Sequence, residues 1–280
     1  MPADSTVLRF EDVSLSFGTT PALAHVSFET KAGETRVVLG AAGSGKTMLL
    51  KTAVGLVKPD AGRVYLFDQD VTDLKESELF DIRAKVGILF QEGGLFDSLT
   101  IEENVAYPLL NQQALHRNGT LPADEVARRV REALRFVELE HTLDKFPSEL
   151  SGGMRRRVGI ARAVVTTPAL VLYDSPTAGL DPITANTIIS VILKERDLRN
   201  TASIMVTHRY QDGHLMANFR YNPSSGQIEP AARTGREGIS QVTTKFLVMQ
   251  EGRLVFEGSE TELRASADPY IQKFARAGTA

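Results

Sequence analysis

One stretch of eight residues has the side-chain types and spacing to bind a phosphate group. It runs Gly40-Ala41-Ala42-Gly43-Ser44-Gly45-Lys46-Thr47 and fits the pattern G-x-x-x-x-G-K-[ST]. Glycines let backbone N–H groups turn inward around an anion, and the N-terminus of a following helix adds positive potential. Lys46 would reach the β- and γ-phosphates of a nucleotide, and Thr47 would hold Mg²⁺. A strand pattern before the motif and a helical pattern after it favour this site over a structural glycine turn.

A Mg²⁺ ion held by Thr47 needs a second oxygen ligand, and a later strand supplies a candidate. The run Leu170-Val171-Leu172-Tyr173 is largely apolar and is followed by Asp174. Asp174 would therefore lie at the carboxyl edge of a sheet, where ligands of such sheets bind. An aspartate after a strand is often only the first residue of a loop. Its combination with the Gly40–Thr47 motif favours a metal ligand.

The spacing of apolar residues predicts the elements that position these side chains. Alternation from Val7 to Phe28 predicts β-strands. Further along the chain, the pattern predicts strands at 36–39, 170–173 and 203–206, and helices at 48–57, in the range from about 101 to 165, and at 182–199. Within that middle range, Val126, Val130, Leu134 and Val137 recur at helical spacing and are expected to be core. Strands and helices in alternation indicate parallel α/β architecture.

The segment 213–244 interrupts this alternation. It contains two turn-rich stretches, 222–226 and 234–238, and few large apolar side chains. We therefore expect an inserted loop or ribbon that buries little surface. After it, Glu251-Gly252 between two apolar runs predicts a hairpin, and a short helix is expected at about 270–274.

Composition excludes several classes of protein. The 280 residues carry a net charge of −3 and no cysteine, so no disulfide framework and no thiolate metal site is possible. There is no bulk basic field for nucleic acid, and the arginines 155–157 are expected to form a solvated helix face. No secretory signal is recognisable, and no apolar run approaches the ~18 residues of a spanning helix. We expect a soluble chain that reaches a membrane only through a partner.

A second glycine motif identifies a family. Leu150-Ser151-Gly152-Gly153-Met154, followed by the basic stretch 155–163, resembles the signature of ATP-binding-cassette (ABC) ATPases. The resemblance covers nearly the whole chain, from Leu8 to about Ser259. It implies an α/β P-loop NTPase fold of the ABC ATPase type, in which a parallel-sheet core carries an N-terminal antiparallel β subdomain and a helical subdomain. On this basis residues 1–280 form a single domain, with the helical subdomain at about 93–165, the insertion at 213–244 and the C-terminal hairpin and helix at 245–280.

The resemblance also implies roles for single residues. Phe17 would stack on adenine, although a lone phenylalanine is more often core. Gln91 would be the Q-loop glutamine that links Mg²⁺ to a membrane partner. Asp181, in Ala178-Gly179-Leu180-Asp181, looks like the aspartate of the D-loop. His208 would be the switch histidine that contacts the γ-phosphate, where a lone histidine would usually be a cap or solvated.

The signature motif implies a dimer. Ser151, Gly152 and Gly153 precede a helix and make a second anion-binding N-terminus. In relatives each ATP lies between the phosphate loop of one subunit and the signature of the other. The resemblance therefore implies ATP and Mg²⁺ as cofactors, a homodimer of ATPase subunits, an integral-membrane permease as partner, and a peripheral place on the cytoplasmic face of the inner membrane.

One stretch points to a branch of the family. Residues 91–109 closely resemble the ATPases of Mce-associated (Mla-type) phospholipid transporters, in which a permease and a periplasmic Mce protein are further partners. Met154, where glutamine is commoner, and the run 181–184 also suit that branch. An importer ATPase for amino acids or ions is the alternative.

Ser175 departs from the family pattern. Relatives usually place a glutamate directly after the Mg²⁺ aspartate, where it polarises the attacking water. A serine hydroxyl can orient water but does not accept a proton at neutral pH. Two readings stay open: an active ATPase in which other groups compensate, and a nucleotide-gated subunit that dimerises on ATP but barely hydrolyses it. A soluble ABC protein without a permease is disfavoured, because such proteins usually carry two cassettes in one chain.

Overall fold

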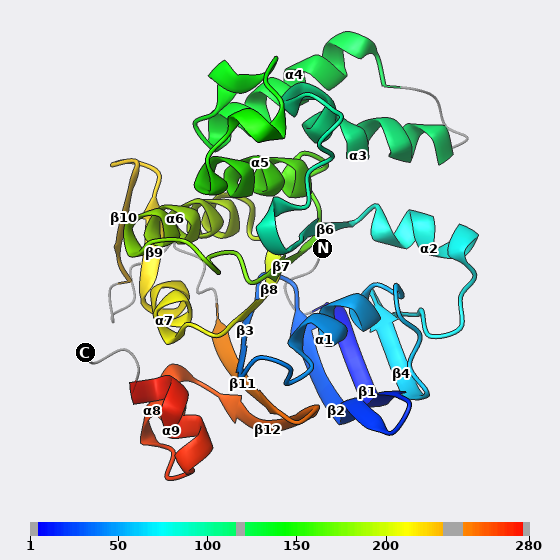
Figure 1. Ribbon diagram of the computed structural model, residues 1–280, viewed down its shortest axis with the longest axis vertical. Helices are drawn as coiled ribbons and strands as arrows, with labels where there is room; N and C mark the ends of the chain where they lie inside the picture. The colour runs from blue at the N-terminus through cyan, green and yellow to red at the C-terminus, as the bar shows by residue number, and fades with distance from the viewer. Residues whose placement is uncertain (1–4, 116–120, 232–242, 277–280) are drawn as a thin grey trace.

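The structure of the protein, a computed structural model, describes residues 5–115, 121–231 and 243–276 (Figure 1). Its main sheet has six strands in the order β12-β11-β3-β8-β7-β6. The parallel members are β3 (Thr35–Gly40), β6 (Val86–Leu89), β7 (Leu170–Asp174), β8 (Ala202–Thr207) and β11 (Thr244–Gln250). Strand β12 (Arg253–Gly258) pairs antiparallel with β11, as the hairpin signal predicted. The predicted parallel α/β core is confirmed.

A second sheet is antiparallel and lies beside the first. It has the order β2-β1-β4-β5 and is formed by β1 (Thr6–Phe17), β2 (Thr20–Lys31), β4 (Ala61–Leu66) and β5 (Gln69–Asp70). Helix α1 (Lys46–Ala53) buries Leu49, Leu50 and Ala53 in one apolar cluster with residues of both sheets. A helix of eight residues is marginal in water, so this contact is what stabilises α1 and fixes the loop before it.

Three long helices lie at one end of the molecule. They are α3 (Ile101–Leu115), α4 (Ala123–Phe136) and α5 (Gly152–Val164), and α5 lies nearest the main sheet (Figure 1). The apolar face predicted for this segment is confirmed, because all four of its residues are buried: Val126, Val130 and Leu134 on α4, and Val137 at its C-cap. Helix α2 (Glu76–Arg83) and the strands β4, β5 and β6 had no counterpart in the sequence prediction.

The predicted insertion 213–244 has different bounds in the structure. After α6 (Pro182–Arg199) and β8, helix α7 (Tyr210–Asn218) contains Gly213, and Thr244 already belongs to β11. Gly213 is not a helix breaker. A Cβ there would lie 2.5 Å from the ring of Phe246, so glycine allows α7 to pack closely on the sheet.

Between α7 and β11 the predicted ribbon is present as the hairpin of β9 (Phe219–Asn222) and β10 (Gln227–Pro230). Phe219 and Ile228 pack against the main apolar cluster, so the hairpin buries more than the sequence suggested. The second turn-rich stretch, 234–238, lies outside the described residues.

The chain ends with two short helices, α8 (Glu260–Ala265) and α9 (Pro269–Arg276). Helix α9 confirms the helix expected at about 270–274, and α8 was not predicted. Within the described ranges, no helix is both long and apolar enough to cross a bilayer.

Candidate functional site

The Gly40–Thr47 loop joins the end of β3 to the start of α1. Gly43 and Gly45 have φ of 76° and 102°, in the left-handed region that favours glycine. A Cβ on Gly45 would lie 2.2 Å from the carbonyl oxygen of Ala22, and one on Gly40 would lie 2.6 Å from that of Met249. The glycines are therefore required by backbone conformation and by close neighbours in β2 and β11.

The Lys46 ammonium folds back over this loop. Its Nζ donates to the carbonyl oxygens of Gly40, at 2.9 Å, and Ala41, at 2.8 Å. Burial lowers the pKa of Lys46, and the nearby Asp174 carboxylate opposes that shift. The remaining hydrogen bond of Lys46 Nζ, at 3.4 Å, goes to the Ser44 hydroxyl, so all three hydrogen-bond partners are neutral. A partly desolvated cation with neutral hydrogen-bond partners gains from an anion that comes within reach.

Asp174 is buried at the end of β7, next to two hydroxyl groups. The hydroxyl of Thr47 lies 3.4 Å from Asp174 Oδ1, and the Ser175 hydroxyl donates to the same oxygen at 3.2 Å. A hydroxyl and a carboxylate are hard oxygen donors of the kind that Mg²⁺ takes beside phosphate oxygens, so Thr47 and Asp174 fit this ion. Ser175 has φ 48° and donates its backbone N–H to Val206, which fixes the turn that follows β7.

Adjacent parallel strands bring the other candidates to the same edge of the sheet. Strand β6 ends just before Gln91, β7 ends at Asp174, and β8 ends just before His208. Gln91 and His208 are both exposed at this carboxyl edge, on either side of Asp174 in the sheet order. This edge of the sheet therefore carries an amide, a carboxylate and an imidazole at the ends of three neighbouring strands, and Asp174 lies beside Thr47 of the phosphate loop.

Phe17 lies on the antiparallel sheet, at the end of β1 where the chain turns into β2. Its side chain is 57% exposed, so it is not part of the core. Strand β2 lies directly beside the phosphate loop: a Cβ on Gly45 would come within 2.2 Å of the carbonyl oxygen of Ala22 in β2. An exposed aromatic ring on the same hairpin fits a platform for a flat base.

The signature residues form the N-terminus of α5, on an element separate from the phosphate loop. Ser151 caps this helix by accepting from the backbone N–H of Met154, and Gly153 packs so closely on α6 that a Cβ would lie 2.4 Å from Thr184. Asp181 caps α6 by accepting from the N–H groups of Ile183 and Thr184. The pKa of Asp181 is lowered, first by hydrogen bonding with the Thr184 side chain and then by the Thr184 backbone N–H.

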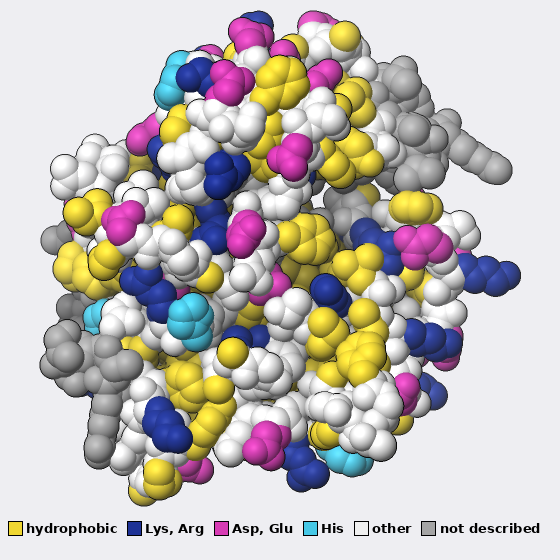
Figure 2. Space-filling model, viewed as in Figure 1, with side chains coloured by type: hydrophobic (Ala, Val, Ile, Leu, Met, Phe, Trp, Pro, Cys, Tyr) yellow, Lys and Arg dark blue, Asp and Glu magenta, His cyan; other side chains and the backbone are white. Residues whose placement is uncertain are grey.

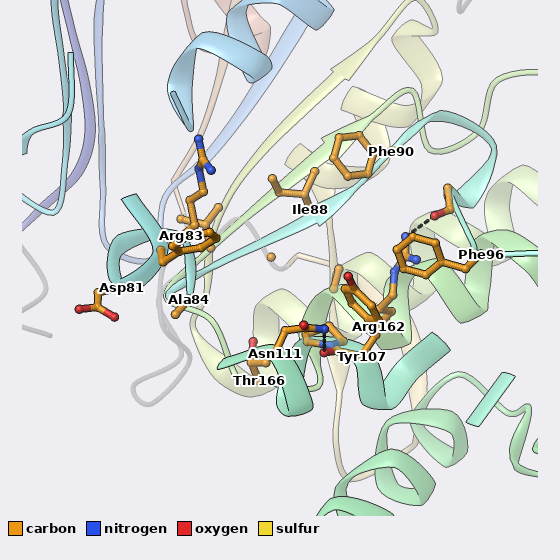
Figure 3. A pocket seen from close by; sticks show the side chains of 16 residues that line it. Asp81, Arg83, Ala84, Ile88, Phe90, Phe96, Tyr107, Asn111, Arg162 and Thr166 are labelled. Atoms are coloured by element: carbon orange, nitrogen blue, oxygen red, sulfur yellow. Dashed lines mark hydrogen bonds between the residues drawn. The ribbon is translucent and has the colours of Figure 1, made fainter. Parts of the chain in front are cut away.

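A pocket lies next to Gln91. It has a volume of about 710 Å³ and is lined by residues of α2, β6, α3 and α5 and of the turn after Gln91. Figure 3 shows the rings of Phe96 and Tyr107 on one side, with the Arg162 guanidinium between them and the turn. Arg162 donates to the carbonyl oxygens of Gly93, at 3.0 Å, and Gly94, at 2.7 Å, which fixes the turn. On the face in Figure 2 a hollow opens between the helical end and the part that carries α2.

Two sets of residues near the site were missed or misread from the sequence. The Tyr270 hydroxyl in α9 accepts from the Ala41 N–H at 3.3 Å and donates to the Met249 carbonyl, so the last helix touches the phosphate loop. No pattern around Tyr270 indicated this contact. The expectation that arginines 155–157 are solvated is wrong for Arg156, which is 5% exposed and donates to loop carbonyls.

Comparisons with known proteins agree with this geometry. The sequence model of the family described as "ABC transporter" matches residues 23–178. A methionine import ATP-binding protein, MetN of Carboxydothermus hydrogenoformans, is 33% identical over 86% of this chain, which spans 62% of that relative. The chloroplastic protein TRIGALACTOSYLDIACYLGLYCEROL 3 of Arabidopsis thaliana is 32% identical over 97% of this chain and 74% of its own length.

Among solved structures, the ATP-binding cassette MJ0796, in a dimeric post-hydrolysis state bound to ADP and phosphate, is 29% identical. The alignment covers 90% of this chain and 98% of that one, with a TM-score of 0.72. The chain therefore belongs to the ABC transporter family and has the fold of an ATP-binding cassette.

Proposed function

We propose that this protein is the ATP-binding and ATP-hydrolysing subunit of an ABC transporter. The observation that carries the proposal is the Gly40–Thr47 loop, with the Lys46 ammonium bent over it and Thr47 beside Asp174. Lys46 would exchange two backbone carbonyls for phosphate oxygens, and Thr47 and Asp174, with Gln91, would hold Mg²⁺. The metal ion, when bound, neutralises charge that builds up on the transferred phosphoryl group.

In this proposal the residues at the sheet edge orient the water and the γ-phosphate. His208 donates to the γ-phosphate, and Ser175 orients the attacking water without taking its proton. Turnover is then slow. Release of phosphate from ATP and Mg²⁺ by the purified protein tests this: slow, Mg²⁺-dependent release supports it, and no release in any assembly supports a nucleotide-gated binding subunit instead.

In this proposal the signature of one subunit, at the N-terminus of α5, completes the nucleotide site of a second copy of the chain. Ser151, Gly152 and Gly153 would contact the ATP held by the other subunit, with Asp181 beside the shared interface. The dimeric state of the similar cassette MJ0796 supports this arrangement. Size-exclusion chromatography with and without ATP and Mg²⁺ tests it, because ATP should shift the protein to a dimer.

The pocket beside Gln91 is the proposed contact with a membrane permease. Its apolar rings are accessible: Phe96 is 42% exposed and lies 4.6 Å, between ring centroids, from the equally exposed Tyr107. Exposed rings around a hollow are typical of a surface that another protein covers. Through this contact the subunit would sit peripherally on the cytoplasmic face of the inner membrane.

For the cargo we favour phospholipid, moved with an Mce-type permease complex. Residues 91–109 support this by resemblance. The relative that aligns over 97% of the chain is named for trigalactosyldiacylglycerol, which is a lipid. The methionine import relatives favour the second candidate, an amino-acid importer.

The two cargoes are separated by reconstituting the subunit with its permease in nanodiscs. Phosphate release that responds to phospholipid supply, and not to methionine, supports the lipid transporter. The reverse response supports the importer and contradicts the lipid assignment.

A further inference from the structure

The loop that follows Asp174 is held from one side by a buried arginine. Arg156 lies on α5, in the second turn after the signature, and is 5% exposed. Its Nη1 donates to the carbonyl oxygen of Pro176 at 2.8 Å, and its Nη2 donates to that of Ala178 at 2.7 Å. A planar guanidinium that bridges two carbonyls fixes both their distance and their direction.

A buried aspartate holds the residue between them. Asp212 lies on α7 and is 1% exposed. Its Oδ2 accepts from the hydroxyls of Thr177, at 2.5 Å, and Thr207, at 2.8 Å. Thr207 is the last residue of β8 and directly precedes His208, so Asp212 connects the loop after β7 to the strand end that carries the histidine.

The three consecutive residues 176–178 are thus hydrogen-bonded by two side chains of opposite charge, one on α5 and one on α7. Burial lowers the pKa of Arg156 and raises that of Asp212, and the Arg209 guanidinium, 3.6 Å from Asp212 Oδ1, opposes the second shift only in part. A core that needed only apolar packing would be at least as stable with neutral side chains here. The retained charges therefore point to precise placement of the loop.

We propose that Arg156 and Asp212 form a two-sided clamp on residues 176–178 that positions Ser175 and His208 relative to the γ-phosphate. The inference rests on the proposed ATPase function. Arg156 is on the helix whose N-terminus is the signature, and Asp212 is on the helix after His208. The clamp therefore ties the signature, the loop from Ser175 to Asp181 and the switch histidine into one unit, so that they move together when two subunits close on ATP.

Both clamp residues are buried and act through the loop, so they are positioning residues. Misplacing a reacting group by about 1 Å can lower a rate by about 10²-fold. Loss of one hydrogen bond to a buried charge is expected to lower kcat about tenfold or more. The phosphate loop shares no residue with the clamp, so the affinity for ATP should change less than about twofold.

The test uses substitutions that preserve shape. Thr177→Val removes one hydroxyl from the clamp, and Thr177→Ser restores it without the methyl group. Arg156→Met removes both carbonyl bonds. The control is Thr201→Val, because the Thr201 hydroxyl is also buried and also faces a buried carboxylate, Glu195, but lies before β8, at the end opposite His208.

Each variant is assayed for kcat at saturating ATP and Mg²⁺, for ATP affinity by equilibrium binding, and for Tm. We expect a tenfold or greater loss of kcat with unchanged affinity in Thr177→Val and Arg156→Met, wild-type kcat in Thr177→Ser, and wild-type kcat in Thr201→Val. Unchanged kcat in Thr177→Val, failure of Thr177→Ser to restore it, or an equal loss in Thr201→Val would overturn the clamp. A wild-type protein that hydrolyses no ATP would instead overturn the proposed function on which the clamp depends.

Discussion

Replacing Ser175 by glutamate should accelerate ATP hydrolysis. The side chain at this position is half-buried, and its hydroxyl lies 3.2 Å from Asp174 Oδ1, next to the proposed metal site. The backbone is already in the left-handed region, with φ 48°, for a residue that has a Cβ, so glutamate adds no new backbone strain there. A carboxylate at this point would face the attacking water and could take its proton.

The magnitude follows from what general-base assistance contributes. It accelerates reactions about 10²- to 10⁴-fold, or about 3–5 kcal/mol of barrier at 1.36 kcal/mol per factor of ten. A base added without refinement of its surroundings should give less than the full effect, so we expect Ser175→Glu to raise turnover at least tenfold, toward the lower limit of about 10²-fold. The ATP-bound dimer should be long-lived in the wild type and shorter-lived in the variant, because hydrolysis breaks its interface.

The assay is single-turnover phosphate release, with the dimer followed by size-exclusion chromatography. Ser175→Gln is the matched control, because it has the shape of glutamate without a group that accepts a proton at neutral pH. Equal rates for Ser175→Glu and Ser175→Gln would refute the reasoning. So would a wild-type enzyme that already hydrolyses ATP quickly, since another group would then be the base.

Three further predictions concern the pocket, the hairpin and a buried carboxyl group. Phe96→Asp should leave ATP binding intact but release the protein from its permease during co-purification, because a charge would replace an exposed ring; complete retention would contradict this. Deleting residues 224–238 should lower Tm. Ile228→Ala should also lower Tm, because loss of a half-buried side chain lowers the free energy of unfolding by about 1 kcal/mol. An unchanged Tm would show that the hairpin is dispensable for stability. Burial raises the pKa of Glu195 from 4.5 to about 7. Between these two pH values the folded protein keeps a proton that the unfolded chain releases. The contribution of Glu195 to the free energy of unfolding is therefore fully present below about pH 4.5 and is lost as the pH rises through 7. Glu195→Gln should therefore raise Tm more at pH 8 than at pH 5, and equal shifts at the two pH values would contradict the assignment.

Local sequence patterns were sufficient for most elements that carry the site, but β6, which leads to Gln91, was not predicted, and α1 begins and ends earlier than the predicted range 48–57. Helix α6 was predicted with its bounds, 182–199, because Asp181 and Pro182 mark its start clearly. The strand ending at Asp174 was predicted because a fully buried parallel strand is a continuous apolar run. These signals lie within a few neighbouring residues, so they can be recognised without knowledge of the fold.

The features that the sequence did not predict depend on contacts between distant segments. Gly213 suggested a break in the chain, whereas its function is close packing against Phe246. Arg156 lies in a run of three arginines that is typical of a solvated face, and only the position of the loop after β7 makes it buried. The Tyr270 contact joins residues more than two hundred positions apart, and no local pattern encodes it.

Equilibrium binding of ATP and Mg²⁺ to wild type, Lys46→Ala and Lys51→Ala tests the central claim most directly. Lys51 is on the same helix, α1, and Lys51→Ala removes the same charge away from the phosphate loop. Because Lys46 would make charge-assisted hydrogen bonds of about 1.5–3 kcal/mol each to phosphate oxygens, its removal should weaken binding at least about 100-fold. The account predicts that loss in Lys46→Ala and wild-type affinity in Lys51→Ala. Equal affinity in all three proteins would show that the Gly40–Thr47 loop is not the nucleotide site and would contradict the account.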